Sequence, residues 1–144
     1  MDFRRITPED VDAVTEIAIR GMRAELYPLN LSREKVRALV RHFAEGGGWN
    51  LCAFESDKPV AVCGVLTQEM PFFERKEAVA VALYSERAGA GWKLIREMFR
   101  WYMADPMLRV LRWPLEWDAE PRMMRIAERA GFNSFSVTAS HYKT

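Results

Sequence analysis

The stretch VALYSERAGAGWKLI, residues 81–95, decides the fold, because it joins the end of an apolar strand to a glycine turn and a helix start. Residues 78–84 form a nearly continuous apolar run, which is typical of a central strand buried on both faces. Gly89 and Gly91 follow, and a helix is predicted from about Ala90. Backbone N–H groups at a helix start lack intrahelical acceptors, so the turn is predicted to bind an anion.

The same turn is also compatible with tight packing alone, since two glycines between a strand and a helix are common. No Gly-Lys-Ser/Thr sequence follows the turn, which excludes a Walker loop. The third glycine of the dinucleotide-binding fingerprint is missing as well.

The flanking sequence predicts one α/β (α+β) domain over residues 1–144, in the order strand, two helices, three strands, helix, strand, helix, strand. Ser32 and Pro121 are predicted to start helices, and Thr7 to cap the first helix with Pro8 at its first position. The predicted strands cover residues 3–6, 49–54, 60–67, 78–84, 110–114 and 132–142.

A two-residue turn at Asp57 and Lys58 is expected between the second and third strands. That turn would place Cys52 roughly opposite Cys63, which makes a disulfide conceivable. Because no secretion signal is visible, both cysteines are instead expected to be reduced and buried.

Composition narrows the function classes. Apolar residues make up 49% of the chain, enough for a core, and 21 basic against 20 acidic residues give a net charge of +1. This balance makes nucleic acid an unlikely general partner, although arginines recur on the last two helices. No segment resembles a signal peptide or a membrane span, so a cytoplasmic location without membrane contact is expected. Neither histidine has a ligand at metal spacing, so no metal is expected.

The glycine turn also resembles the motif of the GNAT superfamily of N-acetyltransferases, Arg/Gln-x-x-Gly-x-Gly/Ala followed by an aliphatic pair. In this chain the pattern reads Glu86-x-x-Gly89-x-Gly91 and continues to Leu94-Ile95. The resemblance extends over nearly the whole chain. Residues 5–10 are similar to the family's first strand and helix cap, and residues 127–132 are similar to its Tyr-Glu-Lys-Leu-Gly-Phe segment. Short phage-encoded members share this layout, including an aromatic-rich loop like that at residues 71–73.

The resemblance implies a GNAT-like mixed, mostly antiparallel sheet with a splayed central strand pair and about four helices. It implies acetyl-CoA as cofactor, with Ala82, Leu83 and Tyr84 along the pantetheine arm. The pyrophosphate would then be held by the turn itself, comprising Arg87, Ala88, Gly89, Ala90, Gly91 and Trp92. The implied activity is transfer of an acetyl group to an amine of a small-molecule or protein acceptor, with a homodimer left open.

Glu77 stands where some family members place a catalytic base, and Tyr84 is a candidate proton donor to the leaving thiolate. A solvated strand end and plain core packing are the respective alternatives. Trp113, Glu116 and Trp117 would face the acceptor, where aromatic faces and acids suit a cation. The alternative is a loop whose aromatic residues cap the core or contact a partner subunit.

Three positions depart from the family pattern. Ala127 replaces the usual general-acid tyrosine, Glu120 replaces an asparagine, and Glu86 stands where a basic or amide residue is usual. The sequence therefore leaves two readings open. One is an active N-acetyltransferase, and the other is a catalytically degenerate GNAT-like binding or structural module, for instance a phage- or host-interaction protein.

Overall fold

The computed structural model describes residues 1–22, 29–114, 121–136 and 139–143. The strands are β1 (Asp2–Arg4), β2 (Trp49–Glu55), β3 (Lys58–Glu69), β4 (Lys76–Ser85) and β5 (Leu108–Arg112). The α-helices are α1 (Val11–Met22), α2 (Arg33–Ala44), α3 (Ala90–Ala104) and α4 (Pro121–Ala130), and a 3-10 helix, Pro8–Asp10, precedes α1.

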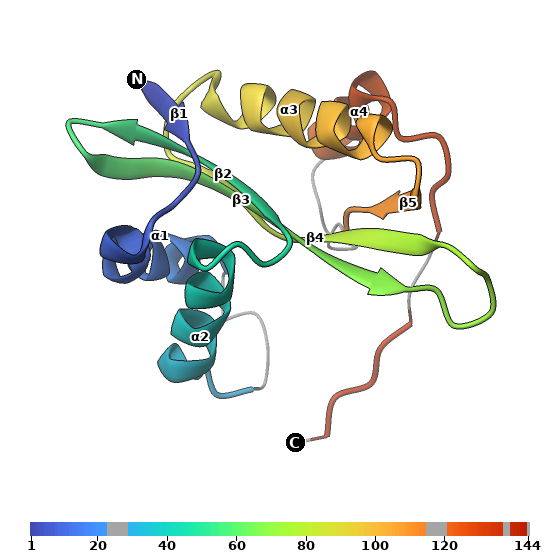
Figure 1. Cartoon of the computed structure of the whole chain (residues 1–144), viewed down its shortest axis with the longest axis horizontal. Helices are drawn as coiled ribbons and strands as arrows, with labels where there is room; N and C mark the ends of the chain where they lie inside the picture. Colours follow the sequence, from blue (N-terminus) through green and yellow to red (C-terminus); the bar gives the residue numbers. More distant parts are fainter. Residues whose placement is uncertain (23–28, 115–120, 137–138, 144) are drawn as a thin grey trace.

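The strands form a single sheet in the order β1-β2-β3-β4-β5. Neighbouring strands are antiparallel except β4 and β5, which run parallel because α3 crosses over between them. Helices α1 and α2 cover one face of the sheet, and α3 and α4 lie on the other (Figure 1). The predicted fold class, a mixed and mostly antiparallel sheet with about four helices, is confirmed.

Each face of the sheet has its own hydrophobic core. On the α3 side, Leu94 and Met98 pack against small strand residues such as Ala78. On the α1 side, Ile17 and Phe43 close over residues of β2 and β3. Because side chains alternate along a strand, β2, β3 and β4 contribute to both cores.

The two cysteines illustrate this alternation and correct one expectation. Ser56 and Asp57 form the hairpin turn, with φ of 50° and 63°, and Cys52 consequently pairs with Val62. Cys52 and Cys63 lie in the cores of opposite faces, so the prediction that they face each other is wrong. Both thiols are free and buried, as expected, and burial raises the pKa of Cys52 to about 12.

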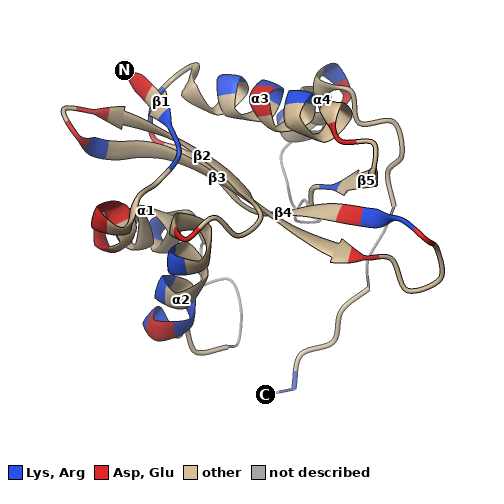
Figure 2. Cartoon of the chain, viewed as in Figure 1, with Lys and Arg blue, Asp and Glu red and all other residues tan. Residues whose placement is uncertain are grey.

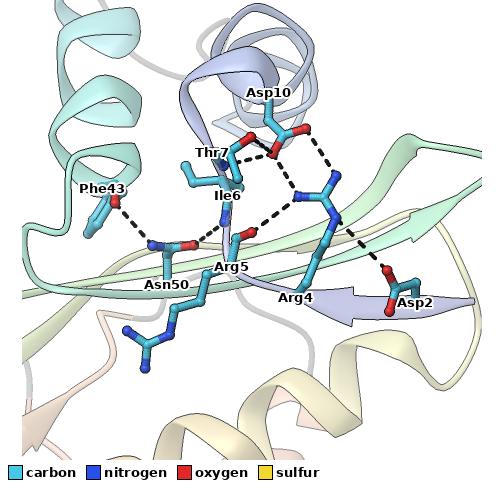
Figure 3. Close-up of polar contacts among 8 residues, drawn as sticks. All are labelled: Asp2, Arg4, Arg5, Ile6, Thr7, Asp10, Phe43 and Asn50. Carbon is cyan, nitrogen blue, oxygen red and sulfur yellow. Dashed lines mark hydrogen bonds and ion pairs between the residues drawn. The ribbon is translucent and has the colours of Figure 1, made fainter.

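The first strand is shorter than predicted because Ile6 has a different hydrogen-bond partner. Its N–H donates to Oδ1 of Asn50 at 3.0 Å, and the Asn50 amide donates to the Phe43 carbonyl at 3.3 Å (Figure 3). The Asn50 side chain is thus the link between the first loop, β2 and the end of α2. A buried amide with partners on both sides fixes where the sheet stops and α1 begins.

The predicted last strand is wrong for the described part of its range. Residues 132–136 and 139–143 form no strand there, and those beyond Phe132 are exposed. A strand is stabilised by pairing with a neighbouring strand and by burial of alternate side chains, and the described residues of this range join no sheet and, beyond Phe132, bury no side chain. Among the described residues, no helix combines the length and the apolar character needed to cross a membrane.

Candidate functional site

Strand β4 extends well beyond its pairing with the shorter strand β5. The parallel pairing of β4 with β5 runs from Lys76 opposite Leu108 to Val79 opposite Arg112. Strand β4 continues to Ser85, and β3 accompanies it to that point. Among the described residues, the edge formed by residues 80–85 therefore has no strand partner on the β5 side. Its backbone groups are free to pair with an extended ligand.

A β-bulge lies just beyond the last pair between β4 and β5. Val65 pairs with Ala80 and Gly64 pairs with Ala82, so Val81 is an extra residue in β4. A bulge bends its strand and increases the local twist, so the unpaired part of β4 begins with a bend. The bulge was not predicted from the sequence. The available signal was Gly64, since a glycine inside a strand often marks a bulge.

The end of β4 is followed by a tightly organised turn. The Glu86 N–H donates to the Val60 carbonyl at 2.8 Å, the last contact of the turn with β3. The Ser85 hydroxyl accepts from the Arg87 N–H at 3.2 Å and donates to the Arg87 carbonyl at 2.7 Å. A Cβ on Gly91 would lie 3.2 Å from Cβ of Ser85, so the glycine permits the close approach of α3 to the strand end.

Gly89 precedes α3 in the left-handed conformation, with φ of 81°. The hydrogen bonds of the described residues include the Ala90 N–H to the Arg87 carbonyl, but they leave the amides of Ala88, Gly89, Gly91 and Trp92 without an acceptor. A Cβ on Gly89 would meet no atom within 4 Å. Open space, free donors and a helix dipole together form a cradle for an anion.

The charged side chains of the turn are engaged elsewhere. The Arg87 guanidinium donates to Glu55 at 2.9 Å, away from the open amides. Glu86 accepts two hydrogen bonds from Arg20 of α1, at 2.9 and 3.0 Å, and one from the Tyr84 hydroxyl at 3.1 Å. The Arg20 contact holds the pKa of the Glu86 carboxyl below its usual range, so this carboxylate is ionised at neutral pH.

Glu77 lies on the paired half of β4 and is 7% exposed. Its carboxylate accepts from Arg112 at 2.9 Å and from the Gln68 amide, and the Arg112 contact lowers its pKa. Glu77 and Tyr84 are seven positions apart on the same strand, a span of about 23 Å at the usual rise. The structure therefore does not bring these two predicted catalytic groups to one reacting atom.

The predicted acceptor-side residues are only partly described. The Trp113 ring packs against Phe132 with 5.8 Å between centroids, at the edge of the α3-side core. Glu116, Trp117 and Glu120 lie outside the described residues. Ala127 is 1% exposed, so the described structure leaves its methyl group buried and offers no ionisable group at this position. In the described part of the chain, no three His, Cys, Asp or Glu side chains cluster as a metal site would require.

No family model matches the sequence, and no curated protein sequence is significantly similar to it. Solved structures do match. A possible acetyltransferase from Clostridium difficile 630 superposes with a TM-score of 0.76 at 14% identity, covering 99% of this chain and 97% of that chain. An aminoglycoside acetyltransferase from an uncultured soil metagenomic sample, in complex with sisomicin, matches at TM-score 0.70 and 17% identity, covering 99% and 95%.

The chain has the fold of GNAT-like acetyltransferases. A transcriptional regulator from Bacillus halodurans C-125 also shares it, with a TM-score of 0.74, 15% identity and coverage of 98% and 99%. At these identities the likeness establishes the fold, while function depends on the site. None of these three proteins is described as phage-encoded, so the expected phage subgroup gains no support from them.

Proposed function

We propose that this chain is an N-acyltransferase that moves an acetyl group from acetyl-CoA to an amine. One observation carries the proposal: the free edge of β4, residues 80–85, leads directly into the open amides at the start of α3. An extended arm and a diphosphate need these two features side by side. The acetyltransferase fold of the chain agrees with this assignment.

The residues of the site fit such a cofactor. Amides of Ala88, Gly89, Gly91 and Trp92 would donate to the pyrophosphate, and the space beside Gly89 admits its oxygens. Ala82, Leu83 and Tyr84 would line the arm along the unpaired edge. The Arg87 side chain would contribute its charge only after leaving Glu55, so we assign the pyrophosphate to the backbone of the turn.

When bound, acetyl-CoA would supply a thioester: the amine nitrogen bonds to the carbonyl carbon, the carbon–sulfur bond breaks, and CoA leaves as a thiol with a proton that the nitrogen gives up. Glu77 would accept the ammonium proton of the acceptor on its carboxylate, which is ionised at neutral pH because its pKa is lowered. The Tyr84 phenol keeps its proton because burial raises its pKa. About 23 Å of strand separate the two residues. We therefore place Tyr84 beside the turn of residues 86–92, called the phosphate turn below after its proposed ligand, rather than beside Glu77.

A second function is favoured by one specific feature, the buried Ala127 at the family's tyrosine position. A chain without that proton donor could bind acyl-CoA and a macromolecule without transferring the acetyl group. This GNAT-like binding module has the same cofactor site as the enzyme. The two functions differ in turnover and agree in cofactor binding.

Titration calorimetry with acetyl-CoA tests the cofactor site. Saturable binding is expected, and no detectable heat at millimolar ligand would overturn both functions. Release of free CoA thiol with an amine panel then separates them. The panel includes sisomicin, which one structural neighbour binds. CoA thiol release that depends on the amine supports the enzyme. Acetyl-CoA binding with no thiol release in the presence of any amine of the panel supports the binding module.

A further inference from the structure

The phosphate turn is tied to α1 by an ion pair that the sequence pattern does not predict. Arg20 and Glu86 are 66 positions apart, yet the guanidinium donates from both Nε and a terminal nitrogen to the two carboxylate oxygens. Two parallel hydrogen bonds of this kind fix both partners in orientation as well as in distance. The Arg20 side chain is 51% exposed and the Glu86 side chain 28%.

A second contact beside the ion pair fixes the same two segments. Gly21 follows Arg20 on α1, and a Cβ there would lie only 2.5 Å from the Tyr84 ring. The glycine therefore allows the ring to lie directly against the helix. The Tyr84 hydroxyl in turn donates to Glu86, so helix, ring and carboxylate form one connected group.

The ion pair with Arg20 neutralises the negative charge of Glu86 at the turn. Glu86 immediately precedes the open amides, where an unpaired carboxylate would repel a diphosphate. The neighbouring cation, Arg87, is paired with Glu55 and offsets the Glu86 charge less than Arg20 does. Arg20 supplies the positive charge from the other side of the sheet edge.

We propose that Arg20 is a positioning and charge-neutralising residue for cofactor binding, acting through Glu86. The inference rests on the proposed function, because it presumes that the turn binds the diphosphate of CoA. It explains how the chain keeps an acid where the family pattern has a basic or amide residue. In this chain the missing positive charge comes from α1.

The test is a double-mutant cycle on CoA affinity, measured by calorimetry with the full chain. R20A exposes the Glu86 charge and is expected to weaken CoA binding about five- to tenfold at low salt. E86Q is expected to bind CoA at least as tightly as the wild type. R20A/E86Q is expected to return to within about twofold of the wild type, because no uncompensated charge remains.

The matched control is R37A. Arg37 pairs with Asp12 across α1 and α2 and is 47% exposed, close to the exposure of Arg20. R37A removes one positive charge and one ion pair away from the turn, so CoA affinity should not change. The R20A deficit should also shrink as sodium chloride is raised, since exposed charges are screened. Thermal unfolding of each variant checks that the chain is folded.

The outcomes separate the inference from the function on which it rests. If the wild type does not bind CoA, the proposed function and this inference both fail. If the wild type binds and R20A binds equally well, the inference alone is overturned. It is also overturned if R20A/E86Q is as weak as R20A, because the lost affinity would then not come from the unpaired Glu86 charge.

Discussion

Asp10 joins the first strand, the first loop and the helical start into one polar group (Figure 3). Its carboxylate accepts from the Arg4 guanidinium at 2.7 and 3.1 Å and from the Thr7 N–H at 2.7 Å. The Arg4 contact is the largest cause that lowers the Asp10 pKa, from 3.8 to about 2. A carboxyl group with a lowered pKa stabilises the fold above its unfolded-state pKa.

Removing this carboxylate should therefore have a pH-dependent effect. D10N is expected to lower the free energy of unfolding by about 2 kcal/mol at pH 7, and the difference should diminish as pH falls from about 4 towards 2. Urea unfolding at pH 7 and pH 3 measures both values. D12N is the control, because Asp12 is 82% exposed and its ion pair should contribute less than about 1 kcal/mol. Equal losses in the two variants would contradict the assignment.

Glu77 is the residue on which the proposed transfer step depends. E77Q keeps the shape of the side chain and an oxygen that can accept from Arg112, but it loses the negative charge of the ion pair and cannot take a proton. Acetyl transfer to a reactive amine should fall by about 10²-fold, with CoA affinity unchanged, because Glu77 lies outside the phosphate turn. Thiol release and calorimetry give the two values.

A neighbouring carboxylate serves as control for E77Q. Glu69 pairs across the sheet with Lys76 and is exposed, so E69Q removes a nearby charge without touching the proposed base. Transfer by E69Q should stay close to the wild-type rate. Wild-type turnover by E77Q would remove Glu77 from the reaction.

At the scale of elements, the start of α3 offers a comparison of two glycines. Gly89 and Gly46 both have positive φ, 81° and 95°, and a Cβ on either would meet no atom within 4 Å. An alanine at either position should therefore cost a similar backbone strain, about 1 kcal/mol. Gly46 lies after α2, far from the phosphate turn in the chain.

Only one of these alanine variants should affect the cofactor. G89A places a methyl group beside the free amides, where a phosphate oxygen would approach, and is expected to weaken CoA binding about tenfold or more. G46A should lose the same stability and keep its affinity. Denaturant unfolding and calorimetry on both variants decide the matter, and equal CoA affinity in the pair would argue against a phosphate at Gly89.

Element boundaries show what the sequence could and could not predict. The helix starts at Ser32, Ala90 and Pro121 were predicted, because each depends on local chemistry. The bulge at Val81 and the missing last strand were not predicted, because they depend on which backbone lies alongside. The hairpin turn between β2 and β3 lies at Ser56 and Asp57 rather than at the predicted Asp57 and Lys58. The reason is the same, because the pairing register of the two strands sets which residues adopt positive φ.

The candidate site, like the element boundaries, was predictable from the sequence only where it depends on residues adjacent in the chain. The glycine turn is visible in the sequence because a strand, two glycines and a helix are adjacent in the chain. Its ion pairs could not be predicted from the sequence, because Arg20 and Glu55, the partners of Glu86 and Arg87, lie far from the turn in the chain. The sequence thus predicted the turn as a candidate anion site, and the structure shows the ion pairs around it.

At the scale of the molecule, acidic and basic residues alternate over the helices and at both ends of the sheet (Figure 2). The chain as a whole is nearly neutral, with a net charge of +1, and the charges around the turn are likewise balanced in pairs, Arg20 with Glu86 and Arg87 with Glu55. Binding of an anionic cofactor would then depend on local amides rather than on a general positive field. This agrees with the low expectation for nucleic acid as a partner, which stays a prediction.

The two cores share their strands, which predicts how the chain unfolds. Cys52 and Cys63 belong to neighbouring strands and to opposite cores, so neither face can lose its helices without exposing residues of the same sheet. Unfolding should therefore be a single cooperative transition. Trp49 and Trp101 stack at 5.5 Å on the α3 side, so tryptophan fluorescence reports mainly on that face, whereas far-UV circular dichroism reports on both.

I17V tests the coupling from the opposite face. Ile17 of α1 is fully buried in the other core, and loss of one methyl group should cost about 1 kcal/mol. Because the cores share β2, β3 and β4, the urea midpoint should fall equally by fluorescence and by circular dichroism. V81A is the control, since Val81 is 42% exposed and its truncation should hardly move either midpoint. A fluorescence midpoint that stays fixed while the circular dichroism midpoint falls would show that the two faces unfold separately.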